Sequence, residues 1–65
     1  MKFRLKDLRI KKGYTQEKLA EVSGVSRPTI WQIENKDDYD TSIGTLERLA
    51  DALDCKVSDI FPTDA

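Results

Sequence analysis

Hydrophobic residues recur at helical spacing along most of the chain, and short polar or glycine-containing breaks separate the runs. The first run contains Leu5 and Leu8 and ends at Gly13, with Lys11 and Lys12 in its last turn, where cations favour the negative end of the helix dipole. No segment alternates as a half-buried strand does. The pattern therefore predicts an all-α domain whose first helix ends at Gly13.

The second and third predicted helices follow each other closely. Thr15 is a good cap for the second helix. The apolar stripe of that helix consists of Leu19, Ala20 and Val22. The third helix begins after Ser26, another capping residue, and has Pro28 in its first turn, where the missing N–H costs no helical hydrogen bond. Only residues 23–25 separate the two, so the helices must cross at a large angle, and we predict a helix-turn-helix over about residues 15–35.

Two further helices are predicted near the carboxyl end. Ser42 can cap the fourth helix and Asp54 can end it. Its apolar face consists of Leu46, Leu49, Ala50 and Leu53. A short fifth helix has Ser58 as its expected cap and is stopped by Pro62. Its apolar residues are Val57, Ile60 and Phe61. The expected fold is a compact five-helix domain that spans residues 1–65.

The size and composition of the chain restrict its chemistry. A domain of 65 residues buries only about 60% of the surface of its unfolded chain, which leaves little core for an enclosed active site. Histidine, the commonest general base and metal ligand, is absent, and Cys55 is the single cysteine. We expect Cys55 to pack as a small apolar residue rather than to act as a redox sensor. No catalytic residue, metal ligand or cofactor is predicted, and an enzyme is the least favoured function class.

Charge divides sharply between the two halves of the chain. Residues 1–36 contain nine lysines and arginines and four acids, a net charge of +5, whereas residues 37–65 contain two bases and eight acids, a net charge of −6. This asymmetry suits a protein that presents one face to a polyanion, although a solvated surface fits the charges equally well. No apolar run approaches the roughly 18 to 20 residues that cross a bilayer, and no signal peptide is evident, so a cytoplasmic location is expected.

The third predicted helix carries more outward-facing chemistry than its packing requires. Ile30 and Ile33 share one face. The remaining positions are Arg27, Pro28, Thr29, Trp31 and Gln32. A solvated surface explains polar residues, but an exposed tryptophan beside arginine and glutamine is unusual there, because these side chains offer paired hydrogen bonds and apolar contact. The pattern indicates that this face meets another molecule.

Three blocks of sequence carry a resemblance to a known family: LKDLR at 5–9, TQEKLA at 15–20 and GVSRPTIWQIEN at 24–35. Their order and spacing resemble the XRE family of bacterial and phage repressors, the lambda-repressor-like Cro/CI-type helix-turn-helix proteins, from about Leu5 to Phe61. The resemblance implies that the third helix lies in the major groove of double-stranded DNA.

The resemblance also implies roles for individual residues. The implied base readers are Arg27, Pro28 and Gln32. The residues implied to contact the DNA backbone or to flank the readers are Gln16, Ser26, Thr29, Trp31, Asn35 and Lys36. Arginine can donate two hydrogen bonds to guanine, glutamine can pair with adenine, and proline can read only a methyl group or a shape. Arg9 and Glu34 match a family pair that joins the first helix to the third as a structural salt bridge.

The expected function is sequence-specific transcriptional regulation, most simply repression by blocking polymerase. One recognition helix reads few base pairs, so we expect a homodimer on a palindromic operator whose half-sites lie about one turn (roughly 34 Å) apart. The surface expected to pair consists of Val57, Ile60, Phe61 and Pro62. Alternatively, Phe61 only closes the core. A different function class also fits: an antitoxin-like module that binds a partner protein through its acidic carboxyl half, with DNA binding secondary.

The segment Asp37–Asp40 departs from the family pattern, which tends to place glycine, proline or basic residues there. Its three aspartates lie next to the implied phosphate contacts, so they should weaken non-specific binding to DNA. They lack the glycine and the closing glutamate of a calcium loop. We therefore expect them to be solvated, or to contact a partner protein, rather than to bind a metal.

Overall fold

The structure is a computed structural model that describes residues 3–36 and 41–61. Its elements, in chain order, are α1 (Leu5–Lys12), α2 (Gln16–Ser23), α3 (Arg27–Asn35), α4 (Ile43–Ala52) and α5 (Val57–Ile60). The described residues contain no strand, and the predicted five-helix all-α fold is confirmed. None of these helices is both long enough and apolar enough to cross a membrane.

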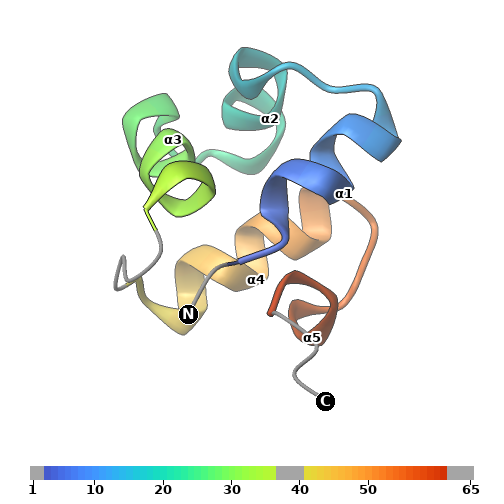
Figure 1. Cartoon of the computed structure of the whole chain (residues 1–65), viewed down its shortest axis with the longest axis vertical. Helices are drawn as coiled ribbons and strands as arrows, with labels where there is room; N and C mark the ends of the chain where they lie inside the picture. The colour runs from blue at the N-terminus through green and yellow to red at the C-terminus, as the bar shows by residue number, and fades with distance from the viewer. Residues whose placement is uncertain (1–2, 37–40, 62–65) are drawn as a thin grey trace.

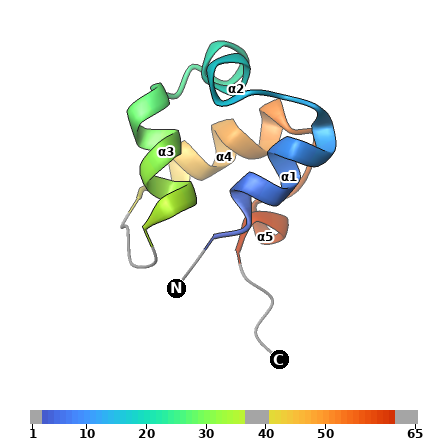
Figure 2. The ribbon, with the colours of Figure 1, turned by 45° about the horizontal axis from the view of Figure 1, so that its top comes forward.

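α4 runs through the middle of the molecule (Figure 1). It packs against α2 on one side and α5 on the other, while α3 packs against α1 and α2 (Figure 2). The α2–α3 pair therefore lies on the side of α4 that faces away from α5. This arrangement leaves the outer side of α3 uncovered by the rest of the described chain.

The predicted helix boundaries around α2, α3 and α4 follow from local hydrogen bonds. Thr15, Ser26 and Ser42 each accept a hydrogen bond from the backbone N–H three residues on, at 3.0, 3.4 and 3.2 Å respectively. Gly13 and Gly24 end α1 and α2 in the left-handed region, with φ of 83° and 77°. Glycine takes this conformation without steric strain, which explains why both helices stop there.

The core is formed by apolar side chains from all five helices and from the turn after α2. Its buried members are Leu5, Leu19, Val25, Ile30, Ile33, Leu46, Leu49, Ala50, Leu53 and Ile60. The face predicted for α4 is therefore confirmed. The stripe predicted for α2 is partly wrong, because Leu19 is fully buried and Ala20 half-buried but Val22 is 45% exposed. Val22 lies about 60° around the helix from Leu19, far enough from the buried position for its side chain to reach solvent.

The ends of α4 and α5 show one confirmed prediction and one error. Asp54 follows α4 with a φ of 57°, a left-handed conformation that aspartate tolerates better than most residues. Ser58 does not cap α5, which begins one residue earlier, at Val57. Instead, Asp59 accepts a hydrogen bond from the Lys56 N–H at 2.9 Å, as a carboxylate in the first turn can. The predicted stop at Pro62 lies outside the described residues.

The first and last described segments hold each other. The Arg4 N–H donates to the Ile60 carbonyl at 2.7 Å. The rings of Phe3 and Phe61 lie with centroids 5.5 Å apart and tilted by 54°, a favourable aromatic geometry. These contacts join the residues before α1 to the end of α5. They add apolar packing to a chain whose small size limits its core.

Replacing Gly24 by alanine should lower the free energy of unfolding by about 1 kcal/mol, because a Cβ is strained at this φ although it meets no atom within 4 Å. Gly44→Ala is the matched control, since Gly44 lies in α4 and its added Cβ meets only Ser42 Oγ, at 4.0 Å. That variant should gain up to about 1 kcal/mol from its better helix propensity. Urea titration measures both changes, and a Gly24→Ala protein as stable as the wild type would contradict this account of the turn.

Candidate functional site

α3 has one buried face and one exposed face. Ile30 and Ile33 have no exposed surface, and Glu34 is only 4% exposed. Around the rest of the helix, Arg27, Pro28, Trp31 and Asn35 are exposed, and Thr29 and Gln32 are half-buried. The structure thus brings Arg27, Pro28 and Gln32, the predicted base readers, to the side of α3 away from the core.

Two hydroxyl groups hold the first turn of α3. Besides capping the helix, Ser26 Oγ lies 2.8 Å from Thr29 Oγ1, within hydrogen-bond distance. Arg27 and Pro28 lie between these two residues. The backbone that carries them is therefore fixed by the cap and by the φ restriction of proline at the start of the helix.

A buried polar network connects α3 to α1 and α2. Arg9 donates from Nε to Glu34 Oε2 at 2.7 Å and from Nη2 to Glu34 Oε1 at 3.1 Å, so the pair is bidentate. Arg9 Nη1 also donates to the Tyr14 carbonyl at 2.8 Å, and Gln16 Nε2 donates to Glu34 Oε1 at 3.0 Å. The side chains of Arg9 and Glu34 are only 12% and 1% exposed. Arg9 and Glu34 thus occupy the structural role that the resemblance implies for them.

The starts of α2 and α3 border a common cavity. Its volume is about 390 Å³, and it is lined by Arg9, Thr15, Gln16, Glu17 and Arg27. Gln16 is the first residue of α2, and the helix dipole makes this end positive. The cavity therefore combines an arginine from α3 with a helix N-terminus, a pairing that favours an anionic group, although Glu17 also lines it.

The last turn of α3 leads to the predicted backbone-contacting residues. Asn35 Nδ2 donates to the Trp31 carbonyl at 2.9 Å, so this amide is partly committed to the helix itself. Lys36 is exposed and extended, with a φ of −107°. The acidic segment Asp37–Asp40 lies outside the described residues. Within the described part, no three histidine, cysteine, aspartate or glutamate side chains gather as a metal site requires.

The surface predicted to pair with a second copy is smaller than expected. Ile60 is completely buried, so it belongs to the core and offers no surface to a partner. Val57 is half-buried, and Phe61 is half-buried against Phe3. Pro62 lies outside the described residues. The sequence did not distinguish the buried residue from the half-buried ones. In a four-residue helix at the end of a small domain, some apolar residues pack into the core while others stay partly exposed, and their spacing does not tell which.

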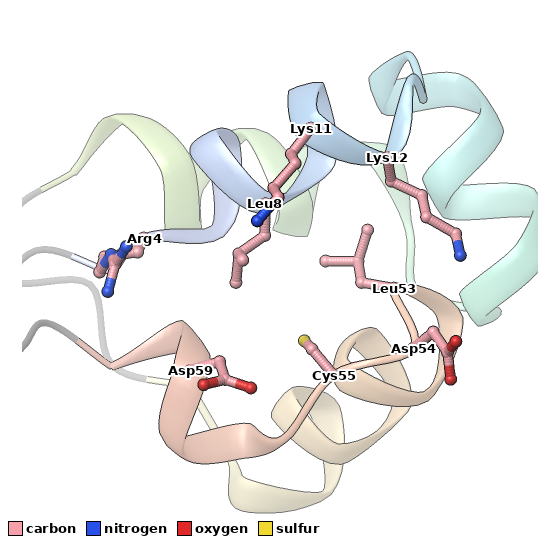
Figure 3. A pocket seen from close by; sticks show the side chains of 8 residues that line it. All are labelled: Arg4, Leu8, Lys11, Lys12, Leu53, Asp54, Cys55 and Asp59. Atoms are coloured by element: carbon pink, nitrogen blue, oxygen red, sulfur yellow. The ribbon is translucent and has the colours of Figure 1, made fainter.

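A separate groove lies between α1 and the segment that joins α4 to α5 (Figure 3). Its volume is about 490 Å³. The lining residues are Arg4, Leu8, Lys11, Lys12, Leu53, Asp54, Cys55 and Asp59. Cations come from α1 and its preceding residue, and the acids come from the opposite wall (Figure 3). Asp54 and Asp59 of the acidic half therefore face cations of the basic half across this groove.

Cys55 lies in this groove and is half-buried against the core. Burial raises the pKa of its thiol, and the negative charges of Asp59 and Asp54 raise the pKa further. A raised pKa keeps the thiol protonated and therefore weakly nucleophilic. This environment supports the structural role expected from the sequence.

Sequence reasoning missed two features of the site. The hydrogen bond from Gln16 to Glu34 gives Gln16 a structural task besides the contact implied for it, and the bond from Arg9 to the Tyr14 carbonyl fixes the turn between α1 and α2. Both are long-range or turn contacts of residue types that are common at surfaces. No local pattern in the sequence signals either contact.

Comparisons with known proteins agree with this architecture. The family model HTH_3, helix-turn-helix, matches residues 5–60. The chain is 43% identical over 61 residues, which are 94% of this chain and 91% of the relative, to an uncharacterized HTH-type transcriptional regulator, YgzD, of Bacillus subtilis. It resembles the crystal structure of the biofilm master regulator SinR in complex with DNA, with a TM-score of 0.79, 36% identity, and 85% and 87% of the two chains covered. It also resembles the restriction-modification controller protein C.AhdI from Aeromonas hydrophila, with a TM-score of 0.80, 36% identity, and 89% and 86% covered.

Breaking the Arg9–Glu34 pair should cost much more stability than an exposed pair. Arg9→Met and Glu34→Gln should each lower the free energy of unfolding by about 3 kcal/mol, because each strands a buried charge, and the double variant should lose much less than the sum. The control is the Lys18–Glu21 pair, at 3.2 Å with side chains 52% and 75% exposed. Lys18→Met and Glu21→Gln should each cost about 0 to 1 kcal/mol. Denaturant titrations test this, and small, additive losses at Arg9 and Glu34 would refute a coupled buried pair.

Proposed function

Because this chain belongs to the helix-turn-helix family of DNA-binding transcriptional regulators, we propose that it recognises a specific double-stranded DNA sequence with α3 in the major groove. The observation that carries the proposal is the division of α3. Ile30 and Ile33, on its inner face, are completely buried, while Arg27 and Pro28 are exposed on the other side. A helix held in this way can enter the groove without loss of its packing.

Recognition is assigned to three side chains of α3. Arg27 can donate two hydrogen bonds to guanine O6 and N7, and Gln32 can pair with adenine N6 and N7. Pro28 offers apolar surface only. Each good bidentate contact contributes about 1 to 3 kcal/mol of discrimination against the wrong base. The capped first turn supports this assignment, since it holds Arg27 and Pro28 in one orientation.

The residues around the readers are assigned to contact the DNA backbone or to flank the readers. They are Gln16, Ser26, Thr29, Trp31, Asn35 and Lys36. The cavity shared by Gln16 and Arg27 supports a phosphate position at the N-terminus of α2. Because Gln16 also donates to Glu34, a phosphate there would bind against a side chain that is already oriented.

We further propose that the protein acts in the cytoplasm as a homodimeric repressor on a palindromic operator. Two copies of α3 about 34 Å apart would read two half-sites on one face of the duplex. A dimer bound there would block polymerase without any other activity. The exposed parts of Val57 and Phe61 are the pairing surface assigned to each copy.

A second candidate function is an antitoxin-like module that neutralises a basic partner protein. It is supported by the net charge of −6 over residues 37–65 and by the acidic wall of the groove in Figure 3. The lysines of α1 on the opposite wall count against a simple acidic docking surface. Co-purification of a basic protein in a fixed ratio would favour this function over operator binding.

Selection of bound duplexes from a random DNA pool, at an ionic strength of about 0.15 M, should enrich an inverted repeat. Arg27→Ala and Gln32→Ala should each relax the selected sequence at particular positions and weaken binding by about 1 to 3 kcal/mol. Lys36→Ala should weaken all duplexes alike and reduce the salt dependence, while Lys11→Ala, in the groove of Figure 3, should change affinity little. Failure to enrich any motif would argue against DNA recognition as the function.

Sedimentation equilibrium of the wild type and Phe61→Ser should separate pairing from core closure. If Phe61 pairs two copies, Phe61→Ser should be a folded monomer by circular dichroism, whereas the wild type should dimerise. Phe3→Ser is the matched control, because it removes the same ring contact and leaves Phe61 in place. Equal behaviour of the two variants, or an unfolded Phe61→Ser chain, would assign Phe61 to internal packing.

A further inference from the structure

The exposed face of α3 has an apolar centre. Viewed down the helix axis at about 100° per residue, the outward residues follow in the order Arg27, Trp31, Asn35, Pro28 and Gln32. The hydrogen-bonding side chains of Arg27 and Gln32 therefore form the two edges of this face. Pro28 and Trp31 lie between them, one helical turn apart.

Trp31 is not explained by packing within the chain. It is 49% exposed on a helix whose opposite face is completely buried. The other large apolar residues exposed in the described chain are Ile10, Val22 and Ile43, and all three are aliphatic residues on other helices. Scattered exposed aliphatic residues are ordinary, but Pro28 and Trp31 are both exposed and lie three residues apart on one helix, a spacing that makes their side chains neighbours in an apolar strip.

Asn35, the remaining residue between the edges, has part of its hydrogen-bonding capacity committed to its own helix. Its Nδ2 donates to the Trp31 carbonyl at 2.9 Å, which holds the amide against the helix backbone. Pro28 has no side-chain donor or acceptor, and an indole has one donor and no acceptor. The middle of the face therefore offers mainly apolar contact.

We propose that Pro28 and Trp31 read C5-methyl groups of pyrimidines in the major groove. The inference rests on the proposed function and adds a chemical feature to its operator. The C5-methyl group of thymine is the apolar group on the base edges of this groove, so an apolar strip can distinguish it from the polar edges of the other bases. Each half-site carries thymine at the positions that Pro28 and Trp31 face, flanked by the base pairs that Arg27 and Gln32 bind. Trp31 is then a specificity-determining residue rather than a flanking one.

The test compares thymine with deoxyuridine at single positions of the selected operator. This exchange removes one methyl group and keeps every hydrogen-bonding group of the base pair. Fluorescence anisotropy should show about a four-fold loss of affinity for each contacted methyl group. The loss should disappear at one position in Pro28→Ser and at another in Trp31→Ala, while Val22→Ala, which changes an exposed apolar residue of α2, should keep it.

A second arm restores the methyl group on a different base. At the same positions, an operator with 5-methylcytosine should bind about four-fold more tightly than one with cytosine. An enriched motif that binds equally well with deoxyuridine overturns this inference and leaves the proposed function intact. A methyl effect that persists in both variants, each folded by circular dichroism, assigns the contact elsewhere and also overturns it. No enriched motif overturns both.

Discussion

The arrangement of the helices depends on the hydrogen bonds that the carboxylate of Glu34 accepts. It belongs to α3 and accepts hydrogen bonds from Arg9 of α1 and Gln16 of α2. A carboxylate with a side chain only 1% exposed is costly unless it is paired, so separating α1 from α3 strands a charge, whereas moving α2 breaks the hydrogen bond from Gln16. This polar contact therefore helps to hold α3 against α1 and α2, together with the small apolar core.

Stability and the proposed recognition surface share residues through this network. Gln16 begins α2, where a phosphate is expected, and its amide donates to Glu34 near the end of α3. Arg9 and Arg27 line the same cavity as Gln16. Displacement of α3 would therefore disturb the expected phosphate position as well as the base readers. Such coupling would preorganise the proposed site, since the groups assigned to DNA contact are held in place before binding.

Local chemistry explains which parts of the fold the sequence predicted. Thr15, Ser26 and Ser42 cap helices through bonds to residues three positions away, and Gly24 turns the chain through its own φ, so each signal is contained in a few residues. The errors are tertiary. Val22 and Ile60 have similar sequence surroundings to other apolar residues, but packing exposes the first and buries the second. Glu34 and Arg9 lie 25 residues apart and were paired by resemblance, because no local pattern joins them.

The distribution of cations also changes how the net charge of +5 over residues 1–36 should be understood. Arg9 is buried against Glu34, and Lys18 pairs with Glu21. Arg4, Lys11 and Lys12 line the groove beside α5. On α3 and directly after it, Arg27 and Lys36 supply positive charge. If the proposed complex makes few phosphate contacts, its non-specific binding to DNA is weak and depends little on salt. In the proposed complex, discrimination would then depend on short-range contacts to base edges, and the apolar strip would keep its contribution at high salt because salt screens charges and not apolar contacts.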